Sequence, residues 1–291
     1  MTGTIGAEAT ISIADGHMPA HLAIPAQTTR RGDDAEHVGV VLLHEGFGLN
    51  SHTRRVAARL AAMGYPTIAP ALFWRSEVLS VGYDDHDEAA RLARSADQTL
   101  LLSDCEQAAA WLRGEVHVTR VVAIGFCFGG SVAFLAATQS AVPSVSAAVA
   151  WYPVRVPQWA LERQRAGFAT DVAKPLMVLL GADDEFVSDD ERLWFRSEIA
   201  AALDASMVEP TGAGHAFAND ARPELYDAAA ASAAWEHVDR FLDRHARTAS
   251  NFAPKTARGP GPETASDSTP GTAPGTARPT SAPHGQSEVP T

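Results

Sequence analysis

The sequence predicts an α/β protein with a mainly parallel sheet that is covered by helices on both faces. Uninterrupted apolar runs, such as Val38–His44 and Leu176–Gly181, are typical of strands that are buried on both faces. Segments with apolar residues at helical spacing alternate with these runs along the chain. Because strands that alternate with helices usually pair in parallel, the helices are expected to pack on both faces of the sheet.

The chain is expected to begin with a β-hairpin. Thr10–Ile13 and His21–Ile24 are short extended runs on either side of a turn. After the buried strand at Val38–His44, Asn50 or Ser51 can cap a helix. That helix is expected to run to about Met63, and a strand is expected at Thr67–Ala69. An irregular segment then covers Trp74–Tyr83, and two helices follow it, at about Glu88–Ala96 and Leu100–Arg113.

In the second half, a strand at Val121–Gly125 leads directly into a helix at Gly129–Thr138. Ser188 and Glu191 have the spacing of a capping box, which predicts a helix start. The other expected elements are strands at Ala147–Trp151, Leu176–Gly181 and Met207–Glu209, a helix from Ser188 to about Leu203, and a final helix at about Ala228–Arg247.

Composition divides the chain near Thr248. Residues 1–247 have a suitable length for one α/β domain. Residues 248–291 contain eight prolines and five glycines, and their only large apolar residues are Phe252 and Val289. Such a segment cannot bury enough apolar surface to offset its ordering entropy. We therefore expect 248–291 to be a disordered Pro/Thr/Ala/Gly-rich tail.

Charge and composition exclude several classes of partner. The formal net charge is −12, which argues against nucleic acid. No apolar stretch approaches the ~20 residues that span a bilayer, and the first residues do not predict a signal peptide. Two cysteines make no disulfide scaffold, and no metal-binding motif is present. We expect a cytoplasmic monomer or small homo-oligomer that needs no cofactor or metal.

The segment Val121–Gly130 has the pattern of a nucleophile elbow, with Cys127 at the centre. A strand ends in Gly-x-Cys-x-Gly, and a helix begins at once. Gly125 and Gly129 remove side chains that would clash in the tight turn. A thiol at a helix N-terminus is favoured as thiolate. Cys127 could also be a buried structural cysteine, but the strand–turn–helix setting favours a nucleophile; Cys105 lacks that setting.

An acid and a histidine follow Cys127 in the chain order of an α/β-hydrolase. Asp183 and Asp184 come just after the strand at Leu176–Gly181, and the residues alone do not choose between them. His215 stands in a loop of small residues. Its imidazole would stabilise the thiolate and carry a proton, while the acid would orient the ring.

Four motifs stand in order along the chain: His44–Gly48, Gly125–Gly130, Gly181–Val187 and Gly214–Phe217. Over residues 8–246 the sequence resembles the dienelactone hydrolase family of α/β-hydrolases. The resemblance implies that Cys127 is the nucleophile, Asp184 the acid and His215 the base. It also implies that Glu45 contacts the thiol and takes its proton when substrate binds, and that the backbone N–H groups of Phe128 and Gly46 form an oxyanion hole.

One position departs from the family pattern. Family members that cleave dienelactones carry an arginine four residues after the histidine, where this chain has Asn219. Arg91 and Arg94 are candidates for a second arginine that binds a substrate carboxylate, and Trp74 is a candidate pocket wall. An arginine can bind a carboxylate through two parallel hydrogen bonds, and an asparagine cannot. The absence of this arginine should therefore weaken recognition of a dienelactone acid.

The leading hypothesis is a hydrolase of a carboxylic ester or lactone that acts through a Cys127 acyl-enzyme. The substrate would be a small molecule. The main alternative is a non-catalytic ligand-binding or scaffold protein that retains the α/β-hydrolase fold. A thiol-transfer protein is a third hypothesis, but no second cysteine is near enough in sequence to resolve a mixed disulfide.

Overall fold

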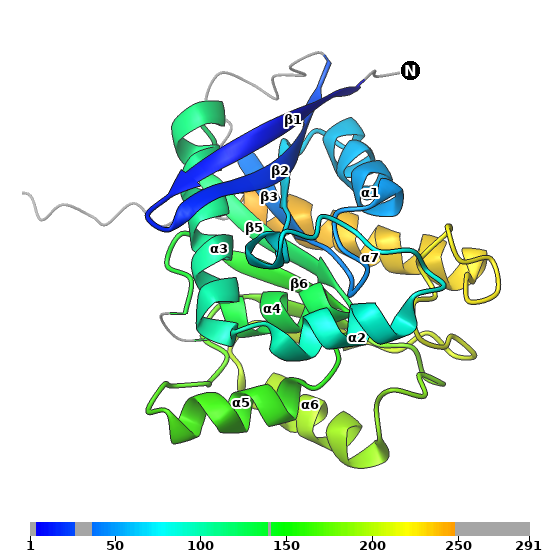
Figure 1. Ribbon diagram of the computed structural model, residues 1–291. Coiled ribbons are helices and arrows are strands. Elements are labelled where there is room, and N and C mark those ends of the chain that lie inside the picture. Colours follow the sequence, from blue (N-terminus) through cyan, green and yellow to red (C-terminus); the bar gives the residue numbers. More distant parts are fainter. Residues whose placement is uncertain (1–3, 27–36, 139–140, 248–291) are drawn as a thin grey trace, which may run out of the picture. The chain divides into compact units, whose positions relative to one another are not determined.

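The computed structural model describes residues 4–26, 37–138 and 141–247 (Figure 1). These residues belong to one compact unit, Met1–Ala253. The expected tail, 248–291, lies outside the described residues, so its disorder and the domain boundary stay predictions. Within the described ranges, no helix has the length and apolar character needed to cross a membrane.

An eight-stranded sheet with the order β1-β2-β4-β3-β5-β6-β7-β8 forms the centre of the unit. The pairs β1–β2 and β2–β4 are antiparallel, and every other neighbouring pair is parallel. The strands are β1 (Thr4–Ile13), β2 (Gly16–Pro25), β3 (Val38–Leu43), β4 (Thr67–Pro70), β5 (Arg120–Phe126), β6 (Ala147–Trp151), β7 (Leu176–Leu179) and β8 (Ala205–Val208).

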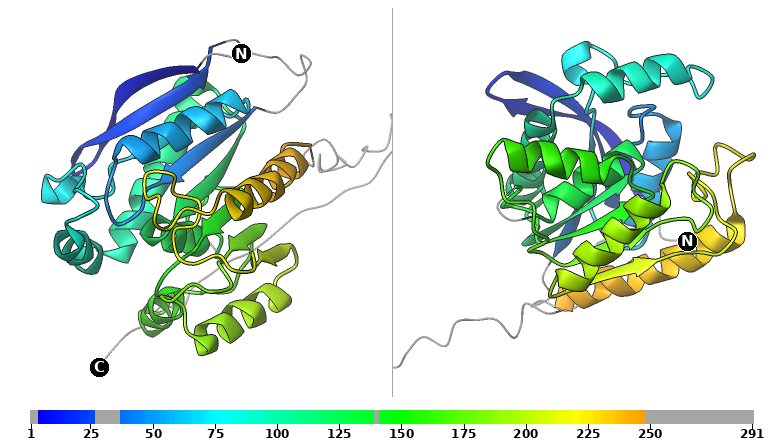
Figure 2. Two further views of the ribbon diagram at one scale, coloured as in Figure 1. Left: turned by 90° about the vertical axis from the view of Figure 1, so that its right-hand side faces the viewer. Right: turned by 90° about the horizontal axis from the view of Figure 1, so that it is seen from below.

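Helices cover both faces of the sheet, as Figure 2 shows. The helices are α1 (Ser51–Ala62), α2 (His86–Ser95), α3 (Gln98–Trp111), α4 (Phe128–Ala136), α5 (Val156–Arg165), α6 (Asp189–Ala201) and α7 (Ala228–Arg247). Side chains of α1 and α7 pack on one face, and those of α3, α4, α5 and α6 pack on the other. Alternate residues of β3 divide between the two layers: Val41 and Leu43 face α3 and α4, whereas Val40 and Leu42 face α1 and α7.

The predicted fold class is confirmed, and most elements lie within a few residues of their expected positions. The N-terminal hairpin is longer than expected, because both of its strands have ten residues. Asn50 is the residue that caps α1, and Ser188 and Glu191 form the expected capping box of α6. The irregular segment at Trp74–Tyr83 contains a short 3-10 helix, Trp74–Ser76, and α3 continues as a π-helix, Leu112–Val116.

Sequence analysis missed one helix, α5. It has only ten residues, and Pro157 stands in its first turn. Proline is well tolerated there, but in a sequence it also signals a break. The buried positions of α5 are Val156, Trp159, Ala160 and Arg163, so an arginine occupies the end of its inward face. A charged residue on the apolar stripe hides the helical pattern.

The topology places the ends of four parallel strands at one edge of the sheet. β3, β5, β6 and β7 are adjacent and run in the same direction. The chain segments that follow them carry Glu45, Cys127, Tyr152 and Asp184. Ligands of open α/β sheets bind at this edge. The fold therefore brings together side chains that lie more than a hundred residues apart in sequence.

Candidate active site

Cys127 occupies a strained turn between β5 and α4. Its backbone has φ 52° and ψ −117°, which a residue with a side chain rarely adopts. The backbone N–H of Cys127 donates to the carbonyl of Trp151 at 2.9 Å and fixes the turn against β6. Cys127 is partly exposed, whereas Cys105 is fully buried. The turn therefore presents the Cys127 sulfur at the edge of the sheet.

Two glycines make this turn possible because backbone segments pass very close to them. A Cβ atom on Gly125 would lie 1.9 Å from the carbonyl oxygen of Gly129. A Cβ atom on Gly129 would lie 2.2 Å from the carbonyl oxygen of Leu43, in β3. Neither glycine has a positive φ, so space, rather than backbone conformation, requires them. The Gly-x-Cys-x-Gly pattern is therefore required because side chains at 125 and 129 would clash with backbone, as the sequence indicated.

His215 bridges the thiol and a carboxylate. Its Nε2 atom lies 3.2 Å from Cys127 Sγ, and its Nδ1 atom lies 2.9 Å from Asp184 Oδ2. The other carboxylate oxygen of Asp184 accepts a hydrogen bond from the backbone N–H of Phe186 at 2.9 Å. Asp184 is buried, whereas Asp183 is exposed. The structure places Asp184, and not Asp183, beside the imidazole.

The surroundings of His215 favour a charged imidazolium. Burial on its own lowers the pKa of His215, but the negative Cys127 sulfur and the hydrogen bond to Asp184 outweigh it and raise this pKa to about 10. At neutral pH the imidazole therefore holds its proton while its Nε2 atom faces the Cys127 sulfur. An imidazolium beside a cysteine favours the thiolate, which is the nucleophilic form of that side chain.

Glu45 is buried near the same edge and is held by two side chains. The hydroxyl of Tyr152 donates to its Oε1 atom at 3.1 Å, and the amide of Asn219 donates to its Oε2 atom at 2.7 Å. In the described part of the chain, the side-chain hydrogen bonds of Glu45 go to these two residues and not to the thiol. No hydrogen bond joins Glu45 to Cys127 among the described residues, and the role that the resemblance implied for Glu45 stays a prediction.

Tyr83 and Asn50 extend the hydrogen-bond network around Glu45. The Tyr83 hydroxyl accepts from the Asn219 amide at 3.0 Å and from the Asn50 amide at 3.1 Å. Burial and the charge of Glu45 raise the pKa of Tyr83, and burial also raises the pKa of Tyr152. Both phenols therefore stay protonated at neutral pH. Asn219, expected at a substrate-binding position, donates to Glu45, and its contact with substrate stays a prediction.

His44 fixes the loop that carries Glu45 and Gly46. Its Nδ1 atom donates to the Glu45 carbonyl at 2.7 Å, and its Nε2 atom accepts from the Leu72 N–H at 2.9 Å. Burial lowers the pKa of His44 to about 4, so the ring is neutral and this donor–acceptor pattern persists at neutral pH. A Cβ atom on Gly46 would meet nothing within 4 Å. The Gly46 backbone thus faces open space on a rigid loop.

The other three expected substrate-binding residues contact side chains outside the group of Cys127, His215 and Asp184. Arg91 is exposed and forms an ion pair with Glu88 on its own helix, α2. Arg94 is also exposed on α2. Trp74 donates from its indole N–H to Asp104 at 3.2 Å, in α3. Among the described residues, none of these contacts joins Trp74, Arg91 or Arg94 to Cys127 or His215. Their role at the substrate stays a prediction.

Arg222 is a cation that sequence analysis did not single out. Its guanidinium lies over the rings of Phe47 and Tyr83, at 5.5 Å and 5.6 Å from their centres. It also donates to Glu224 at 3.1 Å. The position of Arg222, on the loop that carries Asn219, could not be read from the sequence because it depends on how that loop folds back onto Phe47.

Among the residues that the structure describes, no group of three His, Cys, Asp or Glu side chains is placed to hold a metal ion.

Comparison with known proteins agrees with this architecture. The model of the dienelactone hydrolase family matches residues 20–246.

The chain belongs to the dienelactone hydrolase family.

A protein of Escherichia coli K12 named as a candidate carboxymethylenebutenolidase is 32% identical over 235 residues, which cover 79% of this chain and 83% of that protein. A Yersinia pestis protein with the same name is 30% identical and covers 82% of this chain and 88% of its own length. The chain is accordingly a carboxylic ester hydrolase by family, as the sequence predicted.

Solved structures share the fold. A candidate dienelactone hydrolase of Klebsiella pneumoniae is 27% identical and covers 83% of this chain and 99% of its own, with a TM-score of 0.66. A dienelactone hydrolase-like promiscuous phosphotriesterase from metagenomic libraries has the same TM-score at 21% identity and covers 83% of this chain and 98% of its own. At that identity the second comparison supports the fold alone.

The close approach at Gly125 predicts a stability difference between two glycine substitutions. Gly125→Ala should lower the free energy of unfolding by about 3 kcal/mol or more, because the new methyl group meets backbone that cannot move away. Gly114→Ala is the control, since a Cβ atom there meets nothing within 4 Å. It should leave the stability unchanged or raise it by up to about 1 kcal/mol. Urea denaturation measures both, and equal effects would contradict the steric argument.

The ion pair between His215 and Cys127 predicts how alkylation of the thiol depends on pH. The His215 pKa is raised from 6.5 to about 10, so the imidazolium persists as the pH rises and is lost only near pH 10. Alkylation of Cys127 by iodoacetamide should change little between about pH 7 and pH 9. In His215→Ala the rate at pH 7 should fall about tenfold and then climb with pH, as for an ordinary thiol.

Peptide mass spectrometry separates this reaction from that of Cys105. Burial raises the pKa of Cys105 to about 12, so Cys105 should remain unmodified in both proteins. A wild-type rate that climbs with pH as steeply as the rate of the variant would show that no ion pair is formed.

Proposed function

We propose that the protein hydrolyses a carboxylic ester or lactone through a thioester intermediate on Cys127. The observation that carries this proposal is the position of His215, 3.2 Å from Cys127 Sγ and 2.9 Å from Asp184 Oδ2. A nucleophile, a base and an acid that orients the base are the three groups that acyl transfer requires. Membership of the dienelactone hydrolase family supports the same reaction class.

In the first half of the reaction, the Cys127 thiolate attacks the carbonyl carbon of the substrate. A carbon–sulfur bond forms, and the carbonyl oxygen takes the negative charge. When the tetrahedral intermediate collapses, the bond to the alcohol oxygen breaks, and the leaving alkoxide or enolate takes the proton from the His215 imidazolium. The product of this half is a thioester, with His215 neutral.

In the second half, neutral His215 removes a proton from water, and the hydroxide attacks the thioester carbonyl. The carbon–sulfur bond breaks, which releases the carboxylic acid and restores the thiolate–imidazolium pair. Asp184 accepts a hydrogen bond from the Nδ1 atom of His215 throughout and so holds the orientation of the ring. No oxidant, reductant or metal enters this sequence of steps.

The oxyanion of both tetrahedral intermediates needs preorganised donors. We assign this role to the backbone N–H groups of Phe128 and Gly46. Phe128 is the first residue of α4, where a backbone N–H has no acceptor within its own helix. Gly46 lies on the loop that His44 fixes, with open space beside it. Removing one such donor typically costs about 3–4 kcal/mol of transition-state stabilisation.

We infer that Glu45 accepts the thiol proton where Cys127 is still protonated when substrate first binds; later turnovers start from the restored thiolate–imidazolium pair. Its buried carboxylate is anchored by Tyr152 and Asn219. That anchoring fixes the carboxylate group on the loop that follows β3, at the sheet edge that also carries Cys127. The two donors also reduce the cost of burying the carboxylate.

The substrate class follows from the same network. Asn219 stands where dienelactone-cleaving relatives have an arginine, and its amide is already bonded to Glu45 and Tyr83. Both hydrogen bonds of this amide group are made within the protein, so Asn219 cannot bind a substrate carboxylate through two parallel hydrogen bonds as an arginine would. This supports esters and lactones in general, including the dienelactone-like ones, rather than an enzyme that requires a substrate carboxylate at this position.

The proposal predicts which substitutions abolish turnover. In a screen of dienelactones, simple lactones and aryl esters, Cys127→Ala should remove nearly all hydrolysis. Asp184→Asn should lower kcat by about a hundredfold or more, because the wrong tautomer of His215 then faces the sulfur. Asp183→Asn is the matched control, since Asp183 is exposed, and it should retain kcat within about twofold.

Three outcomes would count against this function. Hydrolysis by Cys127→Ala at the wild-type rate would remove the nucleophile from the mechanism. A larger loss in Asp183→Asn than in Asp184→Asn would reassign the acid. A wild-type protein that binds but does not hydrolyse any member of the screen would favour a ligand-binding role for the fold.

A further inference from the structure

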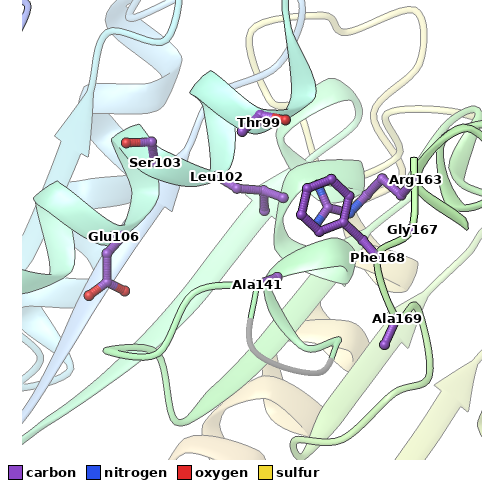
Figure 3. A pocket seen from close by; sticks show the side chains of 9 residues that line it. All are labelled: Thr99, Leu102, Ser103, Glu106, Ala141, Arg163, Gly167, Phe168 and Ala169. Carbon is purple, nitrogen blue, oxygen red and sulfur yellow. The ribbon is translucent and has the colours of Figure 1, made fainter. Parts of the chain in front are cut away.

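A pocket whose lining excludes the candidate active-site residues lies between α3 and the segment that follows α5. Its volume is about 500 Å³, within the range of small-molecule sites. Figure 3 shows the lining side chains, with Arg163 and Phe168 close together on one side and Thr99, Leu102, Ser103 and Glu106 contributed by α3. None of Glu45, Cys127, Asp184 and His215 lines it.

The feature of this pocket that needs an explanation is Arg163. Only 7% of this residue is exposed, because it continues the inward face of α5 that Trp159 and Ala160 also occupy. The buried Nε–H of Arg163 has no hydrogen-bond acceptor. Among the described residues, no carboxylate forms an ion pair with its guanidinium. A protein rarely buries a cation in this way, since an unpaired buried charge loses its hydration without compensation.

The electrostatic surroundings of Arg163 agree with its lack of a partner. Burial lowers the pKa of Arg163, and no nearby acid raises it again. This contrasts with Arg75, whose pKa the carboxylates of Asp104 and Asp15 raise despite burial. Arg75 shows how the fold pairs a partly buried arginine: Asp104 accepts two hydrogen bonds from it, at 2.6 and 2.9 Å.

Phe168 holds the guanidinium of Arg163 in place without using its hydrogen-bond donors. The centre of the Phe168 ring lies 4.5 Å from the Arg163 guanidinium carbon. Stacking on one face of a guanidinium leaves the N–H groups at its edge free for an anion. Phe168 is itself 46% exposed, so a large apolar ring stays in contact with solvent beside the pocket. A ligand with an apolar part would cover that ring.

We propose that this pocket binds a small organic carboxylate, with its carboxylate on Arg163 and its apolar body against Phe168 and Leu102. The inference is independent of the proposed function, since it uses no residue of the candidate active site. A planar carboxylate matches the two parallel donors of a guanidinium edge. The aromatic ring and the leucine provide the apolar surface that an aryl or branched acyl group would contact.

The charge balance of the pocket favours a monoanion over a phosphate. Arg163 is its only cation among the lining residues. In Figure 3 Glu106 lies at the far end of the pocket from Arg163, where its carboxylate accepts from the backbone and hydroxyl of Ser144 at 2.9 and 2.6 Å. A dianion would face one positive and one negative group. A carboxylate with an uncharged body keeps its charge at Arg163 alone.

Calorimetric titration of the full-length protein with benzoate tests the proposal. Benzoate should bind, and Arg163→Gln should weaken its binding by at least about tenfold, because the bidentate pair is lost. The matched control is Arg165→Gln, on the same helix but exposed, which should keep the affinity within about twofold. Benzyl alcohol and inorganic phosphate should each bind at least about tenfold more weakly than benzoate.

Thermal unfolding distinguishes a ligand site from a structural arginine. Arg163→Met removes the unpaired buried charge and should raise Tm, while about 10 mM benzoate should raise Tm of the wild type but not of this variant. Benzoate affinity that is equal in the wild type and Arg163→Gln would overturn the proposal, as would the absence of benzoate binding. Tighter binding of phosphate than of benzoate would overturn the carboxylate assignment. The last contrary result is a Tm of Arg163→Met that is lower than that of the wild type, while benzoate raises it as much as it raises the Tm of the wild type. That result would overturn the proposal and show that Arg163 only stabilises the fold.

Discussion

The contact between the Cys127 sulfur and the His215 imidazole depends on how closely β3, β5 and α4 approach one another. With glycine at 125 and 129, the backbone at the end of β5 can turn against the β3 strand, and the turn then projects the sulfur beyond the sheet. The parallel arrangement of β5, β6 and β7 brings the Asp184 loop to the same edge. His215 completes the contact from the loop after β8. Each residue is therefore positioned by a strand end, and the stiffness of the sheet keeps their distances fixed.

Buried polar groups around this contact are arranged as donors and acceptors that satisfy one another. His44 is neutral and connects the Glu45 loop to the chain after β4, whereas His215 is charged and connects Cys127 to Asp184. The two histidines differ because only His215 faces negative groups. Burial lowers the pKa of both rings, and the negative groups beside His215 reverse the effect there, so the two imidazoles have opposite protonation states at neutral pH.

Much of the fold could be predicted because its strands are uninterrupted apolar runs and its turns carry glycine or capping residues. The helix α5 escaped prediction because Arg163 interrupts its apolar stripe. At the site, Cys127 and His215 stand in motifs with local spacing and the family resemblance selected Asp184, so the sequence could offer as candidates the three side chains that the structure brings together. Tyr152 and Arg222 were not found, since their roles arise from contacts across the fold. The family pattern marked position 219, but its amide serves Glu45, a contact that no local spacing encodes.

The most direct test of the central claim is to trap the intermediate. Wild-type protein is mixed with a slowly hydrolysed aryl ester, quenched in acid within one turnover, digested and analysed by mass spectrometry. The acyl group is predicted on the peptide that contains Cys127, with a mass increase that equals the acyl moiety and disappears as turnover is completed. Acylation of a different residue at the rate of turnover, or full turnover without any covalent adduct, would contradict the account.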